Sequence, residues 1–253
     1  MLRVRVIPCL LLIKESLVKT IKFKRPGYIG DPINTVRIFN ELEVDELCFL
    51  DIRASIEGRS PNLDILHQIA DECFMPLSYG GGIRDAETAQ KILAIGFEKI
   101  VINTSTFENP GVISQIANHS GNQSVIGSID VKRNLWGNYE VYSHDGKRKQ
   151  KVNPITWAQE LEELGVGEIL ITSIDRDGTW KGYDLDIIQR ISETVNVPVI
   201  ANGGAGNVEH LGAAVKYGHA SAVALGSMVV YQQKGMGVLV NFPDREKLKA
   251  LIG

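Results

Sequence analysis

The stretch Pro76-Leu77-Ser78-Tyr79-Gly80-Gly81-Gly82 recurs 122 positions later as Pro198-Val199-Ile200-Ala201-Asn202-Gly203-Gly204. In both copies a proline precedes a short run of mostly apolar residues that ends in glycines, which is typical of a buried strand followed by a turn. The same offset relates residues 45–49 to 167–171, and Gly96 and Ser105 to Gly218 and Ser227; an offset of 119 relates residues 7–10 to 126–129. Four matches in one order predict a chain made of two duplicated halves.

Apolar runs alternate with amphipathic runs along the rest of the chain. Most apolar runs are continuous, as in parallel strands buried on both faces. Eight strand–helix units predict the α/β class and a (β/α)8 TIM barrel built from two half-barrels. An open doubly wound sheet is the alternative, but no GxGxxG turn follows the first strand. The expected strands span residues 3–13, 46–52, 76–79, 99–103, 125–131, 168–174, 197–201 and 220–225, and the expected helices span residues 32–42, 62–73, 85–95, 111–118, 156–164, 185–194 and 208–217.

Length and composition restrict the class of protein. The 253 residues suit one barrel, so we expect a single domain over residues 1–253. A net charge of −3 argues against a nucleic-acid partner. We expect no membrane span, and we interpret the apolar N-terminal run as a strand because no signal-peptide cleavage site follows it. Cys9, Cys48 and Cys73 lack metal-ligand spacing, which favours reduced thiols in a cytoplasmic protein with no metal and no cofactor.

Glycine and small polar residues follow four of the expected strands. Glycine allows a ligand to approach the backbone closely, and amides at adjacent strand ends attract anions. Two equivalent sets therefore predict a ligand with a phosphate at each end, and ordinary turn geometry is the alternative. The sets are Gly81, Gly82, Asn103 and Thr104 in the first half, and Gly203, Gly204, Gly226 and Ser227 in the second.

Carboxylates also lie at strand ends. Asp130 ends the fifth strand among apolar residues, where a raised pKa suits an acid or base, although a solvated strand-end aspartate is the alternative. Asp177 follows the sixth strand and either holds a substrate hydroxyl or shapes the turn, and Asp51 is similar. The first-half equivalent of Asp130 is Leu11, which cannot transfer a proton.

Charged residues at the other strand ends are unusual for a barrel core. Arg5, Glu46, Lys99 and Glu168 are expected to form either a ring that gates the barrel or ordinary surface salt bridges. Segment 14–31, which carries Lys19, is long for a connection and favours either a mobile basic lid or a solvated loop.

The chain closely resembles the cyclase subunit of imidazole glycerol phosphate synthase along essentially its full length. The resemblance implies a (β/α)8 barrel that receives ammonia from a separate glutaminase subunit docked at its base. In that family ammonia passes through the barrel to a bisphosphorylated ribonucleotide, the imidazole ring closes, and a ribonucleotide fragment leaves. The matching stretches are residues 49–52, 80–83, 102–104, 108–110, 129–133, 172–179 and 203–206.

The resemblance also implies roles for individual residues. One of the family's two catalytic aspartates matches Asp130, and the other falls at Leu11; Glu15 is too far along to replace it without a loop rearrangement. Lys19 matches the mobile-loop lysine, and Asp177 matches the mouth carboxylate. The predicted phosphate residues match by position. All four gate residues are present, and this correspondence favours the gate over surface salt bridges.

Four retained gate residues beside Leu11 at a catalytic position imply that the ammonia conduit is kept and that the cyclisation chemistry is impaired. Relatives in surface-polysaccharide gene sets work with a glutaminase homologue and a sugar amidotransferase, so we expect ammonia delivery for nucleotide-sugar and lipopolysaccharide amidination. One alternative is a functional cyclase of histidine biosynthesis that forms imidazole glycerol phosphate and an aminoimidazole carboxamide ribonucleotide. A second alternative is a non-catalytic scaffold that binds a phosphorylated metabolite.

Overall fold

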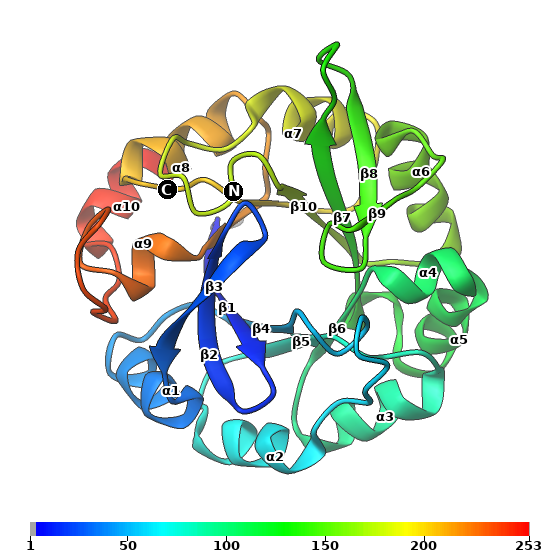
Figure 1. The fold of residues 1–253 in the computed structure, drawn as a ribbon, viewed down its shortest axis with the longest axis horizontal. Coiled ribbons are helices and arrows are strands. Elements are labelled where there is room, and N and C mark those ends of the chain that lie inside the picture. The colour runs from blue at the N-terminus through cyan, green and yellow to red at the C-terminus, as the bar shows by residue number, and fades with distance from the viewer. Residues whose placement is uncertain (1–3, 253) are drawn as a thin grey trace.

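Eight parallel strands close into a ring in the computed structural model, which describes residues 4–252 (Figure 1). The pairing of β12 with β1 and of β7 with β10 closes the ring, so the predicted (β/α)8 barrel is confirmed. Residue 3, the expected start of the first strand, lies outside the described residues. The barrel strands are β1 (Arg5–Ile13), β4 (Leu47–Asp51), β5 (Leu77–Gly80), β6 (Lys99–Ile102), β7 (Val125–Arg133), β10 (Glu168–Ser173), β11 (Val199–Asn202) and β12 (Ala222–Leu225).

Helices surround the ring and bury one apolar face each against it. In α7, for example, Ile187, Ile188 and Ile191 are buried. Five of these helices begin at an Asp or Asn side chain that accepts a hydrogen bond from the first turn, which satisfies otherwise unpaired backbone donors. The predicted helices correspond to α1 (Pro32–Glu41), α2 (Leu63–Glu72), α3 (Ala86–Ile95), α5 (Gly111–Ser120), α6 (Pro154–Leu164), α7 (Leu185–Ser192) and α8 (Val208–Lys216).

Four of the helices between residues 4 and 252 were not expected. Three of them are too short to show a helical apolar period in the sequence: α4 (Thr104–Glu108), η1 (Asn122–Ser124) and α9 (Ser227–Val230). The fourth, α10 (Arg245–Ile252), lies in a strongly charged segment. No helix between residues 4 and 252 is both long and apolar enough to cross a membrane.

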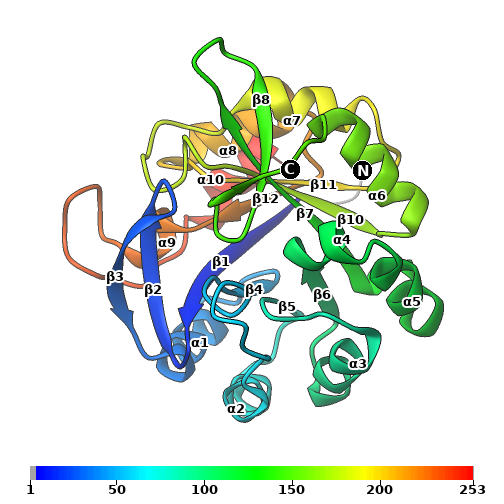
Figure 2. The same cartoon turned by 45° about the vertical axis from the view of Figure 1, so that its right-hand side comes forward.

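Each half also carries a hairpin beyond its first barrel strand (Figures 1 and 2). Segment 14–31, which was expected to be a lid or a solvated loop, forms a hairpin of β2 (Ser16–Ile21) and β3 (Lys24–Gly30), because β1 extends past the barrel and pairs with β2 in antiparallel fashion. In the second half β7 pairs with β8 (Tyr139–Ser143), which pairs with β9 (Arg148–Lys149). Both hairpins project from the end of the barrel where the strands finish.

The strand register confirms the duplication and refines it. Leu11 lies opposite Leu50, and Asp130 lies opposite Thr172, so residues 11 and 130 occupy equivalent places in the two halves. The last unit is shifted by one residue. Ser78 pairs with Lys99 and Ile200 pairs with Ala222, so the offset there is 123, and Thr104, not Ser105, is the counterpart of Ser227.

The barrel interior contains an apolar layer between the charged base and the polar mouth. It is a cluster of buried residues separate from the main core between barrel and helices, because alternate residues of a strand point to opposite sides. Its members are Ile7, Cys9, Cys48, Val101, Ile126, Leu170, Ile200, Ala222 and Ala224.

We expect Gly167→Ala to destabilise the barrel at the β7–β10 closure. The Gly167 N–H donates to the Val125 carbonyl, and a Cβ there would overlap the backbone of Asn122 and Gln123. Overpacking of this kind costs about 1–3 kcal/mol. The free energy of unfolding in urea measures it, and Gly30→Ala, with nothing within 4 Å of a new Cβ, is the matched control. Equal stability of the two variants would contradict this account.

Candidate active site

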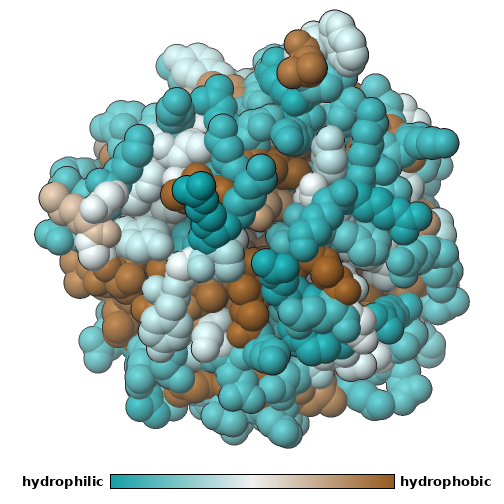
Figure 3. All heavy atoms as spheres, in the orientation of Figure 1, coloured by the Kyte–Doolittle hydropathy of each residue, from teal (hydrophilic) through white to brown (hydrophobic). Residues whose placement is uncertain are grey.

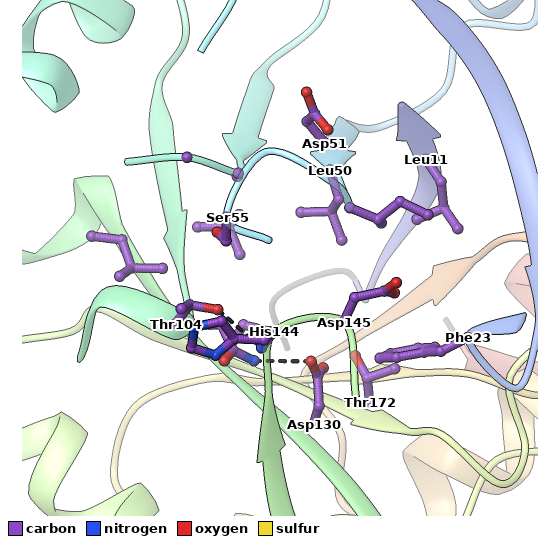
Figure 4. A pocket seen from close by; sticks show the side chains of 18 of the residues that line it. Leu11, Phe23, Leu50, Asp51, Ser55, Thr104, Asp130, His144, Asp145 and Thr172 are labelled. Atoms are coloured by element: carbon purple, nitrogen blue, oxygen red, sulfur yellow. Dashed lines mark hydrogen bonds between the residues drawn. The ribbon is translucent and has the colours of Figure 1, made fainter. Parts of the chain in front are cut away.

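A pocket opens at the carboxyl ends of the barrel strands. Residues from both halves line it, among them Leu11, Asn103, Asp130, Thr172 and Asp177 (Figure 4). Figure 3 shows that hydrophilic side chains dominate this face of the molecule, with smaller hydrophobic patches. The position agrees with the place where barrels of this kind carry their active sites.

Asp130 is the acidic residue that projects from the β7 strand into this pocket. Its Oδ2 accepts a hydrogen bond of 2.9 Å from Asn103 Nδ2. Burial, together with the nearby carboxylates of Asp145 and Asp177, raises the pKa of Asp130 to about 8. Asp130 is therefore largely neutral at pH 7 and has a proton to donate.

Leu11 takes the equivalent place in the first half and lines the same pocket. It offers an apolar wall where Asp130 offers a carboxyl group. Glu15 does not replace it: this exposed residue accepts a hydrogen bond from Asn62 Nδ2 and is not among the residues that line the pocket. The expected vacancy at residue 11 is therefore not filled from its own strand or turn.

A further carboxylate, Asp145, enters the pocket from the turn between β8 and β9. His144, Asp145 and Gly146 all have positive φ, and the His144 N–H donates to Thr104 Oγ1 at 3.2 Å. Burial raises the pKa of Asp145 to about 6. Sequence analysis missed this residue, although Asp-Gly between strand-like runs is a hairpin signal that would place it at the mouth.

The two predicted sets of phosphate-binding residues have similar backbone geometry but differ in their exposure to the pocket. Gly81 and Gly82 have positive φ, as do Gly203 and Gly204, and a Cβ at Gly81, Gly82 or Gly204 would overlap neighbouring backbone. All four residues of the first set line the pocket, whereas none of the second set does. Of the two sets, therefore, only the first is open to the pocket. The first set is Gly81, Gly82, Asn103 and Thr104, and the second is Gly203, Gly204, Gly226 and Ser227.

Lys19 covers part of the second set. A Cβ at Gly226 would lie 2.8 Å from Lys19 Cε, so the lysine side chain rests on that turn. Lys19 Nζ donates to Asp177 Oδ1 at 2.7 Å, and Thr20 Oγ1 donates to Asp177 Oδ2 at 3.0 Å. Both ion-pair partners are buried, so this pair holds the β2–β3 hairpin down over the mouth.

Asp51 shapes a turn and does not present a free carboxylate. Its Oδ1 accepts hydrogen bonds from the backbone N–H groups of Arg53 and Ala54, each at 3.0 Å. Arg59 donates to both carboxylate oxygens, at 3.0 and 3.2 Å. Of the two roles considered from sequence, the turn role is the one that these contacts support.

Four charged side chains meet across the base of the barrel. Arg5 donates to Glu46 at 2.6 Å and to Glu168 at 2.9 Å. Lys99 Nζ lies 3.2 Å from the nearest Glu46 oxygen and 3.1 Å from Glu168 Oε1. The charges alternate around the ring, and Glu168 Oε2 is buried without a hydrogen-bond partner among the described residues.

Among residues 4–252, no group of three or more His, Cys, Asp and Glu side chains has an arrangement that would hold a metal ion.

Comparison with known proteins gives consistent matches. The model of the histidine biosynthesis protein family matches residues 5–235. A protein of Pseudomonas aeruginosa, provisionally named imidazole glycerol phosphate synthase subunit hisF2, is 51% identical over 248 residues, 98% of this chain and 99% of its own. A protein of Leptospira interrogans, provisionally named imidazole glycerol phosphate synthase subunit HisF, is 46% identical over 252 residues, 99% of each chain. Imidazole glycerol phosphate synthase subunit HisF of Alkaliphilus metalliredigens is 43% identical over 233 residues, 92% of each chain.

We expect Asp130→Asn to stabilise the protein in alkali. The folded carboxyl group keeps its proton up to about pH 8, whereas an unfolded one ionises near pH 4, so the native protein loses stability as pH rises between these values. Asparagine keeps the acceptor for Asn103 and carries no charge. The thermal midpoint of Asp130→Asn at pH 9 should lie above that of the wild type, because only the wild type then carries a buried charge at this position.

The same comparison at pH 4 should show little difference between the two proteins, because the wild-type carboxyl group is then neutral as well. Asp71→Asn, at an exposed carboxylate on α2, controls for a general charge effect. Equal midpoints for Asp130→Asn and the wild type at both pH values would show that the carboxyl group is not desolvated.

Proposed function

Because the chain belongs to the histidine biosynthesis protein family, we propose that it is an ammonia-conducting barrel subunit that works with a glutaminase subunit docked at its base. The ring of alternating charges carries this proposal. Arg5, Glu46, Lys99 and Glu168 lie where an apolar core would avoid charge, and burying ions is costly unless they are paired. Such a ring narrows the base, and the movement of one long cationic side chain opens it.

The interior beyond the ring suits ammonia in its neutral form. The layer from Ile7 to Ala224 is apolar, and an unpaired ammonium ion would pay a large desolvation cost there. At the ring, Glu168 Oε2 has unused acceptor capacity that an N–H of ammonia would satisfy. The charged ring and the apolar layer together favour loss of a proton from ammonium before the nitrogen enters the barrel interior.

At the mouth we assign ligand-binding roles to the residues expected from sequence. Gly81, Gly82, Asn103 and Thr104 would hold one phosphate, supported by their place in the pocket wall. The second set of turns, Gly203, Gly204, Gly226 and Ser227, would hold the other phosphate after the β2–β3 hairpin lifts. Lys19 and Asp177 would then be released from each other to meet the ligand.

The proposed fate of the ammonia depends on Leu11. Loss of one proton-transfer group costs about 10²–10⁴-fold in rate, so we propose that cyclisation is slow. We further propose that ammonia passes to a sugar amidotransferase, which converts an acetamido group of a nucleotide sugar to an acetamidino group during surface-polysaccharide or lipopolysaccharide synthesis. The equivalence of Leu11 and Asp130 in the strand register supports this proposal.

A working cyclase of histidine biosynthesis is the second candidate function. One observation favours it: the mouth contains Asp145, a carboxylate outside the family's acid pair. Under either candidate function we propose one domain over residues 1–253 in the cytoplasm, supported by the free thiols of Cys9, Cys48 and Cys73.

The cyclase assay separates the two candidate functions. The purified protein is supplied with the bisphosphorylated ribonucleotide and excess ammonium salt, and the imidazole product is measured. We expect slow turnover, and we expect Leu11→Asp to raise it by about 10-fold or more because it restores a carboxyl group opposite Asp130. Wild-type turnover equal to that of an ordinary cyclase of this family would overturn the proposal of slow cyclisation.

The gate is tested through Lys99→Ala in the presence of the glutaminase partner. We expect glutamine-driven product formation to fall by about 10-fold while ammonium-driven formation is unchanged, because only the former uses the base of the barrel. Lys91→Ala, at an exposed lysine paired with Glu87, is the control. Because Lys99→Ala leaves the carboxylates of Glu46 and Glu168 with Arg5 as their one cationic partner in the ring, folding of the variant is checked by circular dichroism. An unaltered ratio of the two rates would refute the gate.

A further inference from the structure

The mouth contains a carboxyl group that the duplicated sequence pattern does not account for. Asp130 belongs to a barrel strand, and its counterpart Leu11 is inert, yet Asp145 lines the same pocket from a turn. In the view of Figure 4 the Asp145 side chain lies between those of Asp130 and Leu11. A turn has therefore brought a second carboxyl group into the pocket that Asp130 and Leu11 line.

Local contacts fix this turn from two sides. On one side the His144 N–H donates to Thr104 Oγ1, and His144 Nδ1 lies 2.8 Å from Ser143 Oγ. On the other side the Cα of Gly146 packs against Phe23, at the tip of the first-half hairpin, and against Ile174. The two hairpins thus meet over the mouth, and their contact directs Asp145 into the pocket.

The charges around Asp145 suit a group that exchanges a proton. Arg53 and Lys147 favour its ionised form, whereas burial and the carboxylate of Asp177 oppose it. Burial is the main reason that the pKa of Asp130 rises to about 8, and the carboxylates of Asp145 and Asp177 add to it, whereas the pKa of Asp145 is about 6. At pH 7 the pocket therefore holds one mainly neutral carboxyl group and one mainly ionised carboxylate. A pair whose pKa values are pushed apart supplies an acid and a base together.

We propose that Asp145 is a catalytic residue, the second proton-transfer group of the mouth, which works with Asp130 in place of the carboxylate missing at Leu11 on a phosphate-bearing ribonucleotide. This inference rests on the ammonia-conducting function proposed above. It attributes the slow cyclase activity expected there to proton transfer by Asp145.

The proton balance of the step is complete without another reactant. The lone pair of ammonia forms a bond to a carbonyl-type carbon of the ligand, and the carbon–oxygen π pair moves to oxygen. That oxygen takes the proton of neutral Asp130, and ionised Asp145 takes one proton from the attached nitrogen. The products are a neutral carbinolamine, an Asp130 carboxylate and a protonated Asp145, so charge and protons are conserved.

The test is an ammonium-driven cyclase assay of the full-length chain without the glutaminase. Asp145→Asn is the central variant, because asparagine tolerates positive φ and preserves the turn. We expect kcat to fall by about 100-fold with a much smaller change in KM, since the lost group acts in the proton-transfer step. Asp71→Asn, at the exposed α2 carboxylate, should retain the wild-type rate.

Rescue separates a chemical role from a structural one. The double variant Leu11→Asp with Asp145→Asn should recover at least about 10-fold of the lost kcat, because a carboxyl group returns on the strand. An unchanged kcat in Asp145→Asn, a double variant no faster than that single variant, or a wild type without any turnover would each overturn the inference. The ammonia-conducting function is judged separately, by the ratio of glutamine-driven to ammonium-driven product in Lys99→Ala, or by ammonia transfer to a sugar acceptor.

Discussion

Closure of the sheet by the β7–β10 pairing is the constraint on which the rest of the structure depends. Once eight strands form a ring, alternate residues of each strand must face the axis, and the strand register decides which residues share a level. The levels differ chemically along the axis: charges at the base, apolar side chains in the middle, and carboxyl and amide groups at the mouth. One geometric condition thus places the charged ring and the pocket at opposite ends of the barrel.

The sequence was sufficient for the parts that this constraint governs. For Arg5, Glu46, Lys99 and Glu168 the residues alone left a ring and surface salt bridges open, and the family resemblance favoured the ring that the structure shows. Strand positions and the equivalence of Leu11 with Asp130 follow from apolar runs and their spacing. These features are predictable because each depends on side-chain alternation in a strand that is buried on both faces.

The sequence was insufficient where segments far apart in the chain meet. The hairpin at residues 14–31 depends on β1 extending beyond the barrel, which no local pattern reports. The covering of Gly226 by Lys19 and the one-residue shift at β12 are tertiary features of the same kind. Asp145 was not predicted because it does not end a barrel strand. Its place depends on the hydrogen bond of the preceding residue, His144, to Thr104 and on the packing of Phe23 against the next residue, Gly146.

The location of Asp145 on a turn has a consequence for how the protein responds to heat. Barrel strands exchange their amide hydrogens only through large-scale opening, whereas hairpin tips open locally at much lower cost. Under the role proposed for Asp145, its carboxyl group leaves the pocket when the 144–147 turn frays, at temperatures where the barrel and its charged base are still intact. Loss of activity and melting then become separate events, and activity is lost first.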